Sequence, residues 1–244
     1  MQVVAVAPIP TATARAETEI RADVAQAGRV LTALGLVDYL GHASARLPGR
    51  DEVVIKPKHS RRVRSMAELG PSDMVVVDLD GRALRGEDPP PAEVFIHTEI
   101  YQARPDVAAL VHTHQPSATL AGVLGLPILP VLHVPATFVP TDPPVWPHPV
   151  LVDTPERGRQ LATALADAPF CHLQGHGIVS VATDVRAATV GAAMLEQLAD
   201  VALRAAATGR APRVITPSEI EVLRGQVAGI EGRWAYFRQL ADSA

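Results

Sequence analysis

Two histidines, His112 and His114, stand one residue apart at the end of an apolar run, ALVHTH. Residues i and i+2 of a β-strand point to the same face, so both imidazoles would reach toward one point. That arrangement suits two ligands of a single divalent metal ion. A pair of surface or capping histidines is the alternative, and this stretch alone leaves both interpretations open.

Two further residues could join them. His176 lies between Gly175 and Gly177 at a break in the apolar run FCHLQGHGIVSV, and flanking glycines permit the unusual dihedrals and close approach that can aim a side chain. Glu93 opens an expected helix, where the helix dipole favours a carboxylate. The alternative for His176 is an ordinary turn between two strands, and the alternative for Glu93 is an ordinary charge at the start of a helix. For His97, four residues after Glu93, we expect a structural or supporting role.

Three imidazoles and one carboxylate would form a catalytic set. Neutral histidines leave a divalent ion its positive charge and open coordination positions. Such an ion polarises a carbonyl or hydroxyl oxygen and stabilises an enolate, while a neighbouring carboxylate moves a proton. Imidazole ligands suit zinc, manganese, iron and cobalt, so the identity of one ion per subunit stays open.

The elements that must position these residues alternate along the chain. Helical spacing predicts helices over 14–40, 92–103, 115–124, 155–167 and 184–207, and a last one from about 217 that carries Trp234 and Tyr236. Extended patterns predict strands in 42–57, 73–84, 106–114, 128–134 and 170–181. This order predicts one layered α/β domain over residues 14–244, after a flexible extension of residues 1–13.

Composition excludes several classes. The net charge of the 244 residues is −4, without a Lys/Arg block, which argues against a nucleic-acid partner. There is no apolar run long enough for a membrane span. The single cysteine, Cys171, excludes an internal disulfide, fits a cytoplasmic protein and is expected to be a small core residue.

The ordered motifs resemble the class II aldolase/adducin family over roughly residues 15–210. GHASAR, residues 41–46, stands where that family has Gly-Asn-x-Ser-x-Arg, and residues 55–57 match its Ile-Thr/Lys-Pro stretch. EVFIHTEIYQARPDVAALVHTH, which begins at Glu93, is very similar to its Glu…His…Tyr…His-x-His core, and LQGHGIVSV matches its Leu-x-x-His-Gly segment. One His-x-His would be a weak signal, but all of these in order are a strong one.

This resemblance implies a three-layer α/β/α fold with a central, mainly antiparallel sheet, usually in a homotetramer. It implies that His112, His114 and His176 hold the metal ion and that Glu93 is the catalytic acid/base. The adducin-type alternative is a binding module without a reaction. The presence of all four residues argues against that alternative.

The sequence departs from the family at the phosphate site. His42 replaces the Asn, Lys58-His59 replaces a Thr-Gly pair, and Pro91-Ala92 replaces two serines, so most donors for a phosphate dianion are missing. We therefore expect His42, Ser44 and Lys58 to bind a substrate carboxylate, with His133 orienting the substrate nearby.

We therefore interpret the sequence as that of a metal-dependent carbon–carbon lyase that decarboxylates a hydroxylated aromatic or enolic acid. The segments DPPPAEVFIHTEIY and GHASARLPG are most similar to the decarboxylase branch of the family. The alternative is an aldolase that cleaves a 4-hydroxy-2-oxo acid or a sugar-derived substrate to pyruvate or a ketone plus an aldehyde. Both reactions need the same stabilisation of negative charge, and the sequence does not decide between them.

Overall fold

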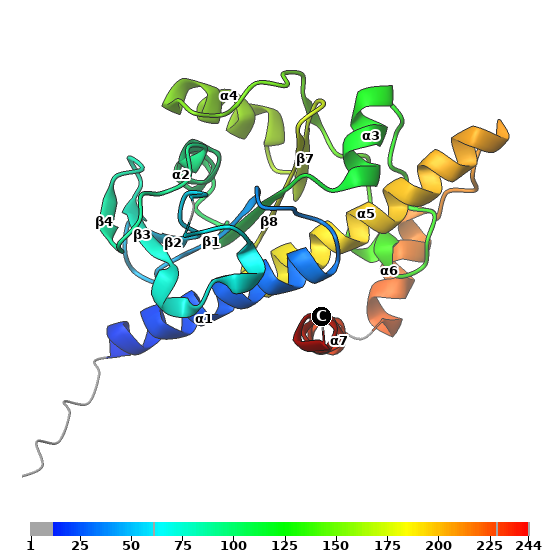
Figure 1. The fold of residues 1–244 in the computed structure, drawn as a ribbon. Helices are drawn as coiled ribbons and strands as arrows, with labels where there is room; N and C mark the ends of the chain where they lie inside the picture. The colour runs from blue at the N-terminus through cyan, green and yellow to red at the C-terminus, as the bar shows by residue number, and fades with distance from the viewer. Residues whose placement is uncertain (1–11, 61, 228, 244) are drawn as a thin grey trace, which may run out of the picture.

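The computed structural model describes residues 12–60, 62–227 and 229–243, which place helices on both faces of one mixed sheet (Figure 1). In this part of the chain the sheet has eight strands in the order β4-β3-β2-β1-β5-β8-β7-β6, antiparallel except for the pair β6 and β7. The predicted three-layer fold with a mainly antiparallel sheet is therefore confirmed.

The strands are β1 (His42–Arg46), β2 (Glu52–Ile55), β3 (Val75–Asp78), β4 (Ala83–Arg85), β5 (Ala109–Thr113), β6 (Val145–Trp146), β7 (Phe170–Leu173) and β8 (Gly177–Ala182). The helices are α1 (Ala12–Ala33), α2 (Val94–Ala103), α3 (Pro116–Leu124), α4 (Pro155–Leu165), α5 (Val185–Thr208), α6 (Pro217–Gln226) and α7 (Ile230–Ser243), with short 3-10 turns at Met66–Glu68, Pro71–Asp73 and Pro135–Thr137. None of the described helices is long and apolar enough to cross a membrane.

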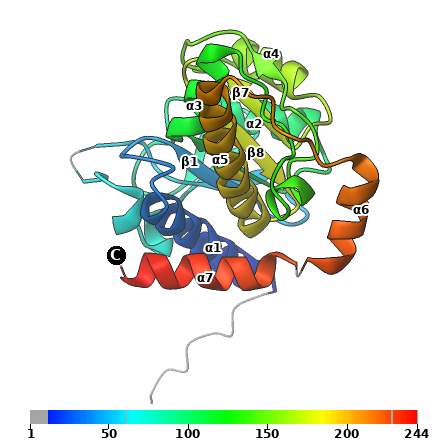
Figure 2. The same ribbon diagram turned by 90° about the vertical axis from the view of Figure 1, so that its right-hand side faces the viewer.

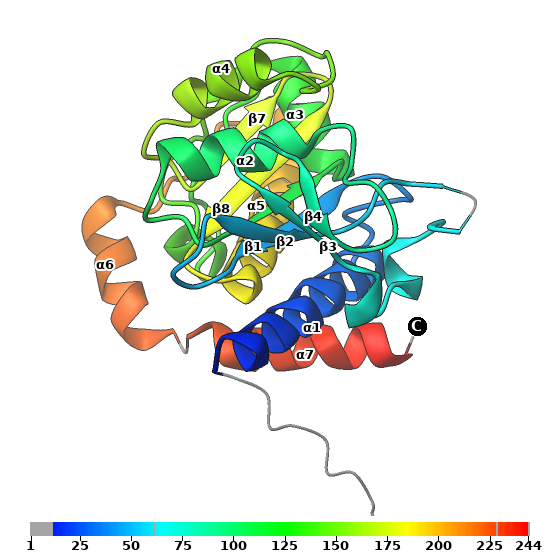
Figure 3. The same ribbon diagram turned by 90° about the vertical axis from the view of Figure 1, so that its left-hand side faces the viewer.

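Strand alternation divides the core between the two faces of the sheet. Ala43 and Val111 pack into a cluster with α1, α5 and the inner side of α7, which runs beside α1 (Figure 2). Leu110 and Val179 face the opposite way, into a cluster with α2 and α4 (Figure 3). Because side chains two apart share a face, His112 lies on the same side of β5 as Leu110, under the α2 layer.

The ends of several elements differ from the prediction. Helix α1 ends at Ala33, well before Gly41, and Gly35 follows with a positive φ of +67°. The expected strand 128–134 is a loop, because the prolines at 127, 130 and 135 remove backbone donors that a strand needs. The chain past 217 forms two helices, α6 and α7, where one was expected.

Three further predictions concern the two chain ends and the single cysteine. The expected extension 1–13 lies outside the described residues apart from Ala12 and Thr13, which belong to α1. Trp234 of the last helix is buried against the core, whereas Tyr236 is exposed. Cys171 is fully buried in β7 and is a core residue, as predicted.

Candidate metal centre and active site

Three histidines converge where the central strands leave the core. His112 is in β5, His114 stands just past its end, and His176 is in the turn that precedes β8. Because β5 and β8 are antiparallel, with Thr113 opposite Ile178, the end of one strand meets the start of the other. One ring nitrogen from each histidine lies within 4.8 Å of the other two. The fold thus brings together the three residues that the sequence analysis singled out.

The protonation of these rings fits a cation. Nδ1 of His112 donates to the carbonyl oxygen of Ile178 at 3.0 Å, which leaves a lone pair on its Nε2. Burial lowers the pKa of His112 well below its usual value and also lowers that of His114, so both rings are neutral. Two neutral imidazoles and the ring of His176, whose nitrogens converge, form a donor set that a divalent metal ion prefers.

The two glycines that flank His176 are required for different structural reasons. Gly175 adopts a positive φ of +69°, which the turn requires. A Cβ on Gly177 would overlap the carbonyl oxygen of Thr113 and stand 3.0 Å from Cδ2 of His114. The missing side chain at Gly177 therefore lets the turn approach β5 closely enough for His176 to join the cluster.

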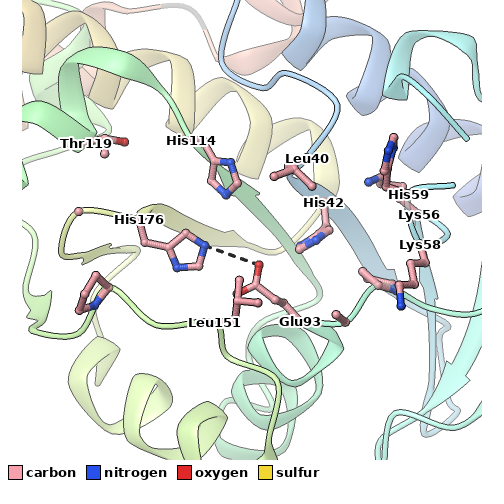
Figure 4. A pocket seen from close by; sticks show the side chains of 14 residues that line it. Leu40, His42, Lys56, Lys58, His59, Glu93, His114, Thr119, Leu151 and His176 are labelled. Atoms are coloured by element: carbon pink, nitrogen blue, oxygen red, sulfur yellow. Dashed lines mark ion pairs between the residues drawn. The ribbon is translucent and has the colours of Figure 1, made fainter.

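Glu93 caps α2 and faces the cluster (Figure 4). Its Oε1 accepts from the backbone N–H of Val152 at 2.9 Å, and its Oε2 is 3.6 Å from Nε2 of His176. Burial by itself raises the pKa of Glu93, but the hydrogen bond and charge of His176, together with Val152, lower it to about 2. The carboxyl group is ionised and positioned to balance positive charge among the histidines.

A cavity of about 580 Å³ opens in front of His114, His176 and Glu93. This volume is typical of sites for small organic ligands. The opposite side carries His42, Lys56, Lys58 and His59, and apolar side chains of Leu40, Leu151, Pro91 and Pro149 form much of the remaining wall. An ionised carboxylate and a basic wall thus face one another across a largely apolar pocket.

Lys56 is a pocket residue to which the sequence analysis gave no role. Only 2 % of this residue is exposed, and its Nζ has a long 3.5 Å contact with the carbonyl oxygen of Tyr39. Burial lowers the pKa of Lys56 to about 8, although the charge of Asp38 partly opposes this shift. The signal in the sequence was a lysine directly after the apolar strand VVI, where a solvated cation is not expected.

Two of the expected substrate contacts, Ser44 and His133, do not line this cavity. Ser44 is fully buried behind the pocket wall, with its hydroxyl bonded to His97 and Tyr101, because α2 covers that face of β1. His133 is exposed and lines a separate cavity against α6, because residues 128–134 form a loop. His42 and Lys58 do line the pocket, and His97 contacts Ser44 and His42.

The chain is similar to known proteins of one family. Residues 22–203 match the family described as class II aldolase and adducin N-terminal domain. A 3,4-dihydroxyphthalate decarboxylase of Arthrobacter keyseri is 32% identical over 231 residues, 91% of this chain and 92% of the relative. Another from Rhodococcus jostii is 36% identical over 206 residues, 79% and 84% of the two chains. The solved structure of an L-fuculose 1-phosphate aldolase, 24% identical, shares the fold with a TM-score of 0.75 over 85% of this chain and 95% of its own.

Proposed function

Because this chain belongs to the class II aldolase and adducin family, we propose that it is a lyase that decarboxylates a dihydroxylated aromatic dicarboxylate of the 3,4-dihydroxyphthalate type. The observation that carries this proposal is the buried amine of Lys56 across the pocket from Glu93 and the three histidines. A substrate with a second carboxylate would supply a close counter-charge for this amine, in addition to the more distant charge of Asp38.

His112, His114 and His176 would hold one divalent ion, which supplies a Lewis acid for a hydroxyl oxygen of the substrate. Zinc, manganese, iron and cobalt remain the candidates. The cluster accounts for the family's typical use of a divalent metal in terms of this chain's own residues.

Glu93 would move the proton. Loss of carbon dioxide leaves an electron pair on the ring carbon, which must take up one proton. The ionised carboxylate of Glu93 accepts the proton of the substrate hydroxyl and returns it to that carbon. Solvent then restores the hydroxyl proton, so each turnover consumes one proton and releases one carbon dioxide.

The other pocket residues would bind the substrate and exclude water from it. Lys56 and Lys58 hold the carboxylate that is retained, and His42 contacts a substrate oxygen. Leu40 and Leu151 keep water away from the carboxylate that leaves. Burial of this group in apolar surroundings destabilises its charge relative to neutral carbon dioxide, which favours its departure.

A product assay tests the proposal directly. Protein loaded in turn with each candidate metal is given 3,4-dihydroxyphthalate, dihydroxybenzoates and 4-hydroxy-2-oxo acids, with H114A as the blank. Carbon dioxide without pyruvate supports decarboxylation, whereas pyruvate plus an aldehyde would establish the aldolase alternative. A protein without affinity for any divalent ion would instead favour the adducin-like binding module.

The proposal also covers the oligomeric state of the protein and its location in the cell. We infer one domain over residues 14–244, a homotetramer and a cytoplasmic location, consistent with relatives that act on small molecules and with the single buried thiol of Cys171. Light scattering of the purified protein measures the oligomeric state.

A further inference from the structure

A row of buried polar side chains leads from α2 to the pocket. The hydroxyl oxygens of Tyr101 and Ser44 are 2.7 Å apart, and Oγ of Ser44 is 2.6 Å from Nδ1 of His97. Nε2 of His97 then faces Nδ1 of His42 at 3.5 Å. All four residues are at most 5 % exposed, yet only His42 lines the cavity.

The row has a direction, because a buried hydroxyl hydrogen needs an acceptor. The hydroxyl of Tyr101 belongs to a buried side chain and bonds to Oγ of Ser44, so Ser44 is the acceptor for its hydrogen. The reverse order would have Ser44 donate to Tyr101 and leave the tyrosine hydrogen buried without a partner, which is unfavourable.

The same direction of hydrogen-bond donation continues through His97 to His42. Having accepted from Tyr101, Ser44 donates its own hydrogen to Nδ1 of His97. Burial lowers the pKa of His97 to about 3, so this ring carries one proton, which must then be on Nε2. That N–H points at Nδ1 of His42, which accepts it. Because Nδ1 of His42 accepts this hydrogen bond, the ring proton of His42 is on Nε2.

We propose that this one-way chain of hydrogen bonds fixes His42 as the Nε2–H tautomer, so that His42 binds an anionic oxygen of the substrate as a hydrogen-bond donor and does not act as a base. His42 then determines specificity for an oxyanion beside the metal cluster, while Tyr101, Ser44 and His97 are positioning residues. The identity of the oxyanion, a carboxylate or a phenolate of the substrate, rests on the proposed function. The tautomer does not.

The tautomer is measured without any turnover. Long-range proton–nitrogen NMR spectra of the zinc-loaded, ¹⁵N-histidine protein distinguish a protonated from an unprotonated ring nitrogen, and loss of one spin system in H42N assigns His42. We expect an unprotonated Nδ1 and a protonated Nε2. A protonated Nδ1 on His42 would overturn the proposal.

Two hydroxyl deletions test the direction of the chain. S44A removes the donor to His97, and we expect the His42 signals to shift toward a mixture of tautomers. T98V is the matched control, because Thr98 lies next to His97 on α2 and its buried hydroxyl has no hydrogen-bond partner among the described residues. Unchanged His42 signals in S44A, or equal changes in both variants, would show that the row does not set the tautomer.

The donor role is tested by binding of 3,4-dihydroxybenzoate, measured by calorimetry. H42L should weaken binding by about ten- to a hundredfold, as for a lost hydrogen bond to a charged group, whereas H42N keeps an N–H donor and should stay within about threefold. Asparagine cannot serve as a base, so an equal decrease of carbon dioxide release in H42N and H42L with unchanged binding in both would contradict the donor role. If the wild-type protein releases no carbon dioxide but the NMR and binding results hold, only the proposed reaction fails.

Discussion

His112 and His114 present their Nε2 atoms 3.1 Å apart, although one belongs to the buried part of β5 and the other lies past the end of the strand. Two nitrogens bound to one tetrahedral zinc ion at normal bond lengths would be about 3.3 Å apart. The alternation of side chains along one strand therefore places these two nitrogens at nearly the separation that two ligands of one ion would need. The third histidine of the cluster, His176, comes from another segment of the chain.

H114A should lose the bound metal and the activity but keep the fold. His114 is partly exposed at the pocket, so its truncation removes one ligand without opening a void in the core. Elemental analysis after exposure to one equivalent of zinc should show less than about a tenth of the wild-type metal content, since loss of one of three ligands weakens binding by orders of magnitude. H133A is the control, because His133 is exposed on another cavity. Full metal content in H114A, or an equal loss in H133A, would refute this ligand assignment.

E93Q should keep the metal and lose most turnover. Glutamine preserves the shape and can still accept from the Val152 N–H, but it cannot take up a proton from the substrate. We expect kcat to fall by about a hundredfold or more, the usual contribution of a general acid–base group. E99Q is the matched control, since Glu99 is a buried carboxylate of the same helix that faces Arg159 on α4. Comparable rates for E93Q and the wild type would remove Glu93 from the mechanism.

Binding of a carboxylate should depend on the protonation of Lys56. Its pKa of about 8 means that the amine is charged below this pH and neutral above it, while a benzoate stays ionised throughout this range. Affinity for 3,4-dihydroxybenzoate should therefore fall as the pH rises through about 8, displaced somewhat upward because the bound anion stabilises the charged amine. K56M should bind more weakly at pH 7 and lack this decrease. A decrease of the same size in K56M would assign it to another group.

Local spacing predicted correctly that three histidines converge, whereas the residues on the opposite side of the cavity were only partly predicted. His112 and His114 share a face by strand alternation, and the glycines around His176 indicate a turn whatever surrounds it. Ser44 shares a face of β1 with His42, two residues earlier, but α2 covers this position, and such packing between distant segments has no local signal. Lys56 was overlooked for the related reason that burial of a charge is visible only once the layers are assembled.

Prolines account for the most consequential error in the fold. The residues 128–134 have the apolar composition of a strand, and a strand there would have led His133 toward the sheet. Three prolines in and around this stretch instead direct it into a loop, and the loop places His133 against α6. Apolar composition alone was a poor guide wherever backbone donors were missing.

G177A should damage the metal centre through the backbone alone. A methyl group at this position overlaps the carbonyl oxygen of Thr113 and touches the ring of His114, so β8 must move away from β5. We expect the free energy of unfolding to fall by about 1–3 kcal/mol and zinc affinity to fall with it, because His176 moves with the turn. G225A is the control: Gly225 has open space around it in α6, and alanine there should change stability by less than about 1 kcal/mol without affecting the metal. Denaturant unfolding and zinc titration of both variants measure the two effects, and normal zinc affinity in a destabilised G177A would show that the close approach of the strands serves the fold and not the site.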